Sequence, residues 1–100
     1  MKQIYRQGDI LLISIESLPE NLKEKDKTIA EGETHGHSHK FTSEQVQVFE
    51  DDSGNQFVEI QQESKLIHEE HAELAISEGT YFVVQQREFD ILDGLSNVQD

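Results

Sequence analysis

The sequence predicts a β-rich single domain, mainly antiparallel with at most short helical turns, arranged as a small sheet or a partly closed barrel. Three observations support this fold class. The chain has 100 residues, the size of one domain, and residues 1–100 are taken as that domain. Its apolar residues occur in short runs that are β-branched or alternate with polar residues, which is typical of strands. Turn-forming residues separate these runs.

The N-terminal third is expected to contain one strand, a loop and two further extended segments. Residues 10–15 (ILLISI) follow a Gly-Asp turn and are predicted to form a strand buried on both faces. Residues 23–27 alternate in charge, which favours a solvated loop, with a short helix as the alternative. The two extended segments are predicted at residues 28–30 and 37–42.

A β-hairpin is predicted in the middle of the chain. Residues 45–50 alternate polar and apolar side chains, and residues 57–61 contain a second short run of strand-forming residues. Between them lies a strong turn sequence, DDSGN, so the two runs are expected to pair. The remaining predictions are a strand at residues 72–76, a central strand at residues 80–86, and an edge strand or loose tail at residues 91–100.

Composition narrows the possible functions. The formal net charge of −13 excludes a large basic surface of the kind that binds duplex nucleic acid. Because there is no cysteine, neither disulfides nor thiolate chemistry are possible. No segment approaches the roughly 20 apolar residues that span a membrane, and the N-terminal sequence lacks the signal-peptide pattern. A cytoplasmic protein without a membrane partner is therefore expected.

All five histidines lie in two short segments, residues 35–40 (HGHSHK) and residues 68–71 (HEEH). In an extended strand, His37 and His39 point to the same face. The two histidines of the second segment share a face only on a helical turn, which is expected there between two strands. Neutral imidazole binds metal ions, and imidazole also transfers protons near neutral pH. This pattern alone leaves metal binding, acid–base catalysis and a structural role open.

The metal interpretation rests on a partial similarity to the cupin motif. Residues 37–39 (HSH) followed by Glu44 resemble its first half, in which H-x-H and a glutamate hold a metal in a small jelly roll. The glycine and proline setting of the second cupin motif is missing, so His68 or His71 would have to supply the fourth ligand. The HEEH spacing also differs from the HExxH of zinc peptidases.

Four motifs together resemble a family of short bacterial, plasmid and phage proteins. They are YRQGD at residues 5–9, GETHGHSHK at residues 32–40, HEEH at residues 68–71 and QRE at residues 86–88. Their order and spacing agree with the family over nearly the whole chain, although His35 and Lys40 stand where many members have other residues. The characterised proteins that the chain resembles are small homodimeric ring nucleases associated with type III CRISPR defence.

This resemblance implies an antiviral-defence enzyme, or an anti-CRISPR protein where a phage carries it. The implied hydrolase binds cyclic oligoadenylate, cleaves it to linear products and so switches off type III CRISPR signalling. It would act as a cytoplasmic homodimer with no cofactor and no metal. The implied catalytic residues are His37, His39, Glu70 and His71. The implied substrate-binding residues are Tyr5, Arg6, Gln7, Lys40, His68, Gln86 and Arg87.

The chemistry of RNA cleavage gives all of these residues except His68 a specific role. Without a metal, cleavage needs a base at the ribose 2′-OH, an acid at the leaving 5′-oxygen and cations near phosphorus. Protons would be moved by His71 with His37 or His39, and Glu70 would orient His71. Phosphates would be held by Arg6, Lys40 and Arg87, while the glutamines contact ribose or adenine and Tyr5 stacks on a base.

Two other classes of function fit the sequence. One is a cupin-like metal-binding protein. The other is a non-enzymatic adaptor from a mobile element, which would bind a basic partner through its acidic surface. The net charge of −13 opposes a polyanionic substrate, so a nuclease site must concentrate the few cations of the chain.

Overall fold

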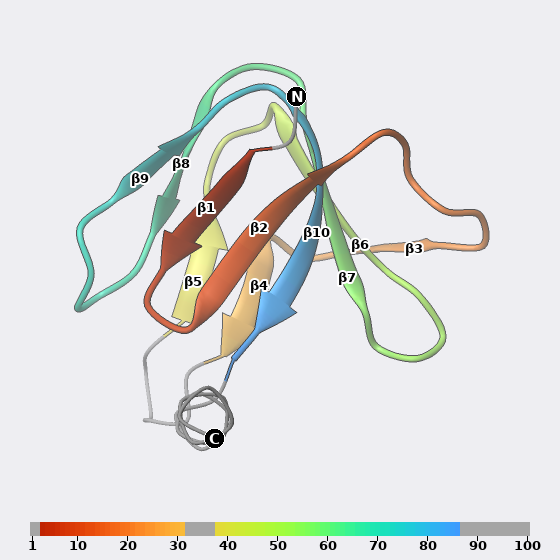
Figure 1. Ribbon diagram of the computed structural model, residues 1–100, viewed down its shortest axis with the longest axis horizontal. Coiled ribbons are helices and arrows are strands. Elements are labelled where there is room, and N and C mark those ends of the chain that lie inside the picture. Colours follow the sequence, from red (N-terminus) through yellow and green to blue (C-terminus); the bar gives the residue numbers. More distant parts are fainter. Residues whose placement is uncertain (1–2, 32–37, 87–100) are drawn as a thin grey trace, which may run out of the picture.

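The computed structural model describes residues 3–31 and 38–86, which form ten β-strands. The strands make two antiparallel sheets that do not close into a barrel, so the predicted antiparallel β fold class is confirmed (Figure 1). The six-stranded sheet has the order β1 (Ile4–Gln7), β2 (Ile10–Ile15), β10 (Gly79–Gln85), β7 (Gln56–Ile60), β6 (Val46–Glu50), β3 (Lys23–Lys25). The four-stranded sheet has the order β4 (Thr28–Glu31), β5 (Ser38–Phe41), β8 (Ser64–Ile67), β9 (Leu74–Ile76).

One hydrophobic core lies between the two sheets. Both sheets contribute buried apolar side chains to it, among them Leu12, Val58 and Tyr81 from the six-stranded sheet and Phe41 and Leu66 from the other. Burying one such side chain stabilises the fold by about 1.5–3 kcal/mol. In the described part of the chain, no helix is long and apolar enough to cross a bilayer.

Strand β2 shows how this core divides the faces of the six-stranded sheet. Ile10 and Leu12 are buried in the core, whereas Leu11 and Ile13 point the other way and are only half-buried. The expectation that this strand is buried on both faces is therefore wrong. Alternation along β2 gives the sheet one inner face and one partly exposed outer face.

The predicted hairpin is confirmed as β6 and β7. The Asp51 carboxylate organises its turn by accepting hydrogen bonds from the backbone amides of Ser53 and Asn55, at 2.9 Å each, and from the Asn55 side chain at 3.0 Å. Gly54 occupies the left-handed region there, with φ 86°. These contacts set the register in which Val48 pairs with Val58.

Several local predictions differ from the structure. Lys23–Lys25 is an edge strand rather than a loop or helix, since Lys23 pairs with Glu50 of opposite charge. Residues 68–71 form a bend and not a helical turn, and the strand predicted at 72–76 begins at Leu74. Strands β1 and β8 were not predicted. The segment 91–100 lies outside the described residues.

Candidate functional site

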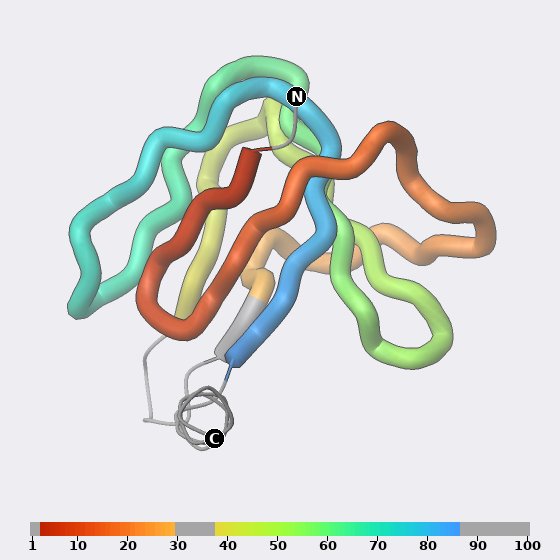
Figure 2. The backbone as a smooth tube through the Cα atoms, in the orientation of Figure 1, coloured from red at the N-terminus to blue at the C-terminus, as the bar shows by residue number. Residues whose placement is uncertain are grey.

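The turn between β1 and β2 carries the first part of the site. Gln7 pairs with Ile10, so only Gly8 and Asp9 connect the strands. Gly8 has φ 59°, which suits the first central position of a two-residue hairpin turn and which other residues rarely adopt. Figure 2 shows this turn on the same side of the molecule as the loop that joins β8 and β9.

His39 on β5 is buried and is held by Gln7. The Gln7 amide nitrogen donates to two backbone carbonyls, Leu66 O at 2.8 Å and Ala72 O at 3.0 Å. This fixes the orientation of the amide, so its oxygen accepts the hydrogen bond from His39 Nδ1 at 2.8 Å. Nδ1 of His39 therefore carries a hydrogen.

The second nitrogen of His39 faces Asp9. Nε2 lies 3.1 Å from Asp9 Oδ1, and the other carboxylate oxygen of Asp9 accepts a hydrogen bond from Gln85 Nε2 at 3.2 Å. Burial lowers the pKa of His39 below its ordinary value of 6.5, and the neighbouring His68 lowers it further, while Asp9 opposes this shift. Because Nδ1 already carries a hydrogen, Nε2 donates to Asp9 only in the charged ring, a form that burial and His68 disfavour and Asp9 favours.

Two more imidazoles from the β8–β9 loop complete a cluster with His39. The ring centres of His39 and His68 are 4.4 Å apart, and those of His68 and His71 are 4.6 Å apart. His68 Nδ1 accepts a hydrogen bond from the Glu70 backbone amide at 3.0 Å. His39 is buried, His68 is half-buried and His71 is exposed, so the cluster, hereafter the histidine cluster, extends from the core to the surface.

Gly8 allows the close approach of His71 to the β1–β2 turn. A Cβ atom added to Gly8 would lie 2.6 Å from His71 Nε2, closer than real Cβ contacts. A second link fixes the same loop to β5, because the Glu69 carboxylate accepts a hydrogen bond from the Ser38 backbone amide at 3.0 Å. The sequence interpretation gave no site role to Gly8 and Asp9, which belong to the YRQGD motif and were expected to form a turn.

Two of the predicted substrate-binding residues have structural roles instead. Gln7 is buried and uses its amide on His39 and two carbonyls, so it holds a histidine rather than contacting ribose or adenine. Tyr5 lies edge-on to Tyr81, and its hydroxyl bonds with Ser77, whose contacts lower the Tyr5 pKa. Tyr5 is thus anchored to Tyr81 and Ser77 within the fold.

The two described cations of the predicted set, Arg6 and Lys40, do not point toward the histidine cluster. Arg6 alternates with Gln7 along β1 and therefore lies on the opposite face, where its guanidinium donates to Gln86 Oε1 at 2.6 Å. Lys40 alternates in the same way with His39 along β5 and is exposed. The structure thus brings Arg6 and Gln86 together, but away from His39. His37 and Arg87 lie outside the described residues.

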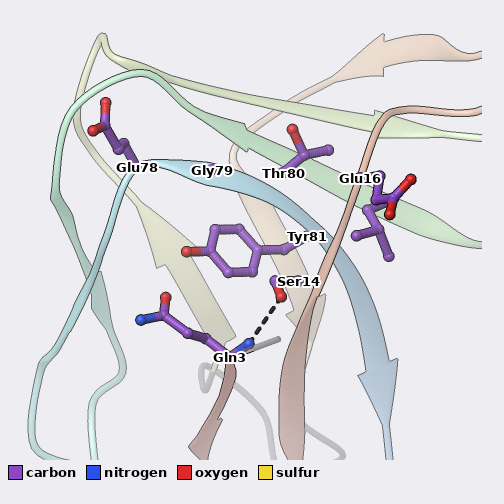
Figure 3. Close-up of a pocket in the computed structure, with 8 residues that line it drawn as sticks. Gln3, Ser14, Glu16, Glu78, Gly79, Thr80 and Tyr81 are labelled. Atoms are coloured by element: carbon purple, nitrogen blue, oxygen red, sulfur yellow. Dashed lines mark hydrogen bonds between the residues drawn. The ribbon is translucent and has the colours of Figure 1, made fainter. Parts of the chain in front are cut away.

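No group of three or more acidic or histidine side chains within residues 3–31 and 38–86 is placed to hold a metal ion. A cavity of about 340 Å³ lies at the other end of β2 and β10, where Gln3, Ser14 and Tyr81 line it (Figure 3). None of the predicted site residues lines this cavity. The candidate site is accordingly the histidine cluster with Gln7, Gly8 and Asp9.

A protein-family model matches residues 6–86, a range that holds every described residue of this site. The family is described as a domain of unknown function, DUF8820. The chain belongs to this family. No curated protein and no solved structure matches the chain. The DUF8820 match begins at Arg6 and ends at Gln86, the two residues whose side chains are joined by a hydrogen bond.

Proposed function

We propose that this DUF8820 protein is a metal-independent ring nuclease that cleaves cyclic oligoadenylate to linear oligoadenylates and so switches off type III CRISPR signalling. The observation that carries the proposal is the histidine cluster, in which three imidazoles from two distant motifs are packed between the core and the surface. The close packing of these imidazoles supports acid–base chemistry. The substrate class comes from the family resemblance of the motifs.

In this proposal, His71 and His68 exchange protons with the substrate. His71 is exposed and His68 is half-buried, so both can be reached from solvent. Their ring centres lie 4.6 Å apart. One ring can therefore serve as the base at the ribose 2′-OH while the other serves as the acid at the leaving 5′-oxygen.

His39 acts as a positioning residue rather than as a catalytic one. Both of its nitrogens face protein partners, Gln7 and Asp9, and its ring lies against His68. A fixed ring against His68 helps to hold the geometry of the reacting pair at small energetic cost during reaction. Glu70 contributes through its backbone amide, which fixes the orientation of His68.

Phosphate binding is the most demanding part of the proposal, since the chain carries a net charge of −13. Arg6 lies near the turn that holds Asp9, and it is joined to Gln86, whose backbone amide donates to Asp9 O at 2.7 Å. This places one guanidinium at the same end of the sheet as the histidine cluster, though on the other face. The proposal includes a cytoplasmic location and a homodimer, whose twofold symmetry would duplicate each contact to a cyclic ligand.

The proposal is tested by incubating the purified protein with cyclic tri-, tetra- and hexa-adenylate, with and without EDTA, and separating the products by chromatography. Linear oligoadenylates that form equally in EDTA are the expected result. Cleavage that is abolished by EDTA and restored by a divalent metal would replace the proposal with a metal-dependent one. No cleavage under any condition would refute nuclease activity.

A further inference from the structure

The cavity at the other end of β2 and β10 lies apart from the histidine cluster and has room for a small ligand. Its volume of about 340 Å³ falls within the range of about 300–1,000 Å³ that small-molecule sites occupy. Eight described residues line it, and they come from the segment before β1, the end of β2 and the beginning of β10 (Figure 3). Three segments that are separated in the sequence therefore meet at this cavity.

The buried Tyr81 ring forms the base of the cavity and is held in place by its neighbours. Its hydroxyl donates to Ser77 O at 2.7 Å, and the Tyr5 ring lies edge-on to it with 5.9 Å between the ring centres. Beside it, the Gln3 backbone amide donates to Ser14 Oγ at 2.9 Å, and Gln3 Oε1 accepts a hydrogen bond from the Tyr5 hydroxyl at 3.1 Å. The cavity is thus preformed, which reduces the cost of ordering it around a ligand.

Gly79 keeps the cavity open next to the Tyr81 ring. Its φ is 150°, in a region that residues with a side chain rarely adopt. A Cβ atom added to Gly79 would lie 3.3 Å from the Tyr81 hydroxyl oxygen, so a side chain here would occupy the space against the ring. The glycine therefore preserves the room for a ligand at this point of the lining.

The charge of the lining favours cations. Among the described residues that line the cavity, the only charged side chains are the exposed carboxylates of Glu16 and Glu78. Figure 3 shows these two residues on opposite sides of the Tyr81 ring. The hydroxyls of Ser14 and Thr80 add further hydrogen-bond acceptors. In a chain whose net charge is −13, a hollow lined in this way attracts cations and repels anions.

We propose that this cavity binds an aliphatic polyamine, a linear molecule whose ammonium groups are joined by methylenes. One ammonium group donates to Glu16 and another to Glu78, and the methylenes between them lie over the Tyr81 ring. Hydrogen bonds between two charged groups are about twice as strong as neutral ones. A monoamine reaches only one of the carboxylates, and a neutral sugar balances neither charge. This site goes beyond the proposed function and does not depend on nuclease activity.

The proposal is tested by isothermal titration calorimetry of the full chain with spermidine, at an ionic strength of about 0.15 M that screens distant charges. Controls are 1-aminobutane, which has one ammonium group, and 1,4-butanediol, which has none. The expected result is one spermidine per chain, weaker binding of 1-aminobutane and no binding of the diol. The proposal would be overturned by a lack of spermidine binding, or by diol or Mg²⁺ binding as tight as that of spermidine.

Charge-neutral variants locate the bound spermidine. Glu16→Gln and Glu78→Gln should each weaken binding by about tenfold, since each removes a charge-assisted hydrogen bond. Asp52→Asn removes the same charge from the β6–β7 turn, at the opposite end of β7 from the residue that pairs with Gly79, and should leave the affinity unchanged. Circular dichroism confirms that each variant is folded. Equal weakening in Asp52→Asn would show attraction to net charge alone and overturn the proposal, as would wild-type affinity in both glutamate variants.

Discussion

Gly8 sets the distance between the β1–β2 turn and the loop that carries His71. It combines a left-handed backbone, φ 59°, with a position where any Cβ would meet the imidazole at 2.6 Å. The two demands are independent, since one comes from the backbone and the other from a side chain 63 positions along the sequence. Gly54 meets only the first demand, with φ 86° and open space around it.

Gly8→Ala is therefore expected to be more harmful than Gly54→Ala. Each substitution forces alanine into the left-handed region, at a cost of about 1–2 kcal/mol. Gly8→Ala should in addition displace His71, so the rate of cleavage should fall by more than tenfold. Gly54→Ala should lower only the free energy of unfolding and leave the rate of cleavage unchanged. Urea unfolding and the cleavage assay measure the two effects. Equal activity in both variants would show that the Gly8–His71 contact has no functional role.

His39 should titrate below its ordinary pKa of 6.5, because burial and His68 both disfavour its charged form. Since the folded pKa lies below the unfolded value, His39 supports the folded state above pH 6.5. That contribution is lost as the pH falls from 6.5 through the folded pKa.

The residue that opposes this shift is Asp9, so Asp9→Asn should lower the pKa of His39 further. Titration of the imidazole resonances by NMR measures this, with Asp52→Asn in the exposed β6–β7 turn as the control. A His39 pKa at or above 6.5, or one indifferent to Asp9→Asn, would contradict the described environment of this imidazole.

At the scale of elements, the β6–β7 hairpin depends on one carboxylate. The hydrogen bond from the Asn55 side chain, followed by those from backbone amides of the turn, holds the pKa of Asp51 below its ordinary value of 3.8. A depressed folded pKa means that Asp51 stabilises the fold above pH 3.8 and that this contribution is lost as the pH falls through the folded pKa.

Asp51→Asn should therefore be less stable than the wild type at pH 7, with a difference that shrinks at pH 3. Urea unfolding at both pH values measures this difference in the free energy of unfolding. Asp52→Asn, at the neighbouring position, is the control, and its free energy of unfolding should change less. A difference between the wild type and Asp51→Asn that is equal at both pH values would show that the carboxylate charge is irrelevant to the turn.

The elements predictable from the sequence were those with a local signal. The β6–β7 hairpin has alternating strands and a strong turn, and β2 and β10 have β-branched runs. Strands β1 and β8 are four residues long and half polar, so their period is too short to detect. Strand β3 exists because it pairs with β6, and no pattern within residues 23–25 predicts that pairing.

At the scale of the whole molecule, the histidine cluster illustrates the same limit. His39, His68 and His71 were recognised from the sequence as chemically suited to one site. The role of Gln7 was not, because it depends on carbonyls of Leu66 and Ala72 that are 59 and 65 positions away. The separation of Arg6 from His39 was not predicted either. Strand alternation gives it only when it is known that Gln7, and not Arg6, lies on the inner face of β1.

The cluster should work as a unit in catalysis. Because proton transfer by a positioned side chain contributes about 10²–10⁴-fold to rate, His71→Ala should lower cleavage by a factor in this range. Gln7→Leu should also lower it, because His39 Nδ1 and the carbonyls of Leu66 and Ala72 lose their partners. The exposed Lys65, which pairs with Glu73, offers a control outside the cluster in Lys65→Ala.

The most direct test is the rate of cyclic oligoadenylate cleavage in EDTA by the wild type, His71→Ala and Lys65→Ala. The account predicts linear products from the wild type and from Lys65→Ala at similar rates, and a loss of about 10²–10⁴-fold in His71→Ala. A His71→Ala variant that cleaves as fast as the wild type, or a wild type that does not cleave, would contradict it.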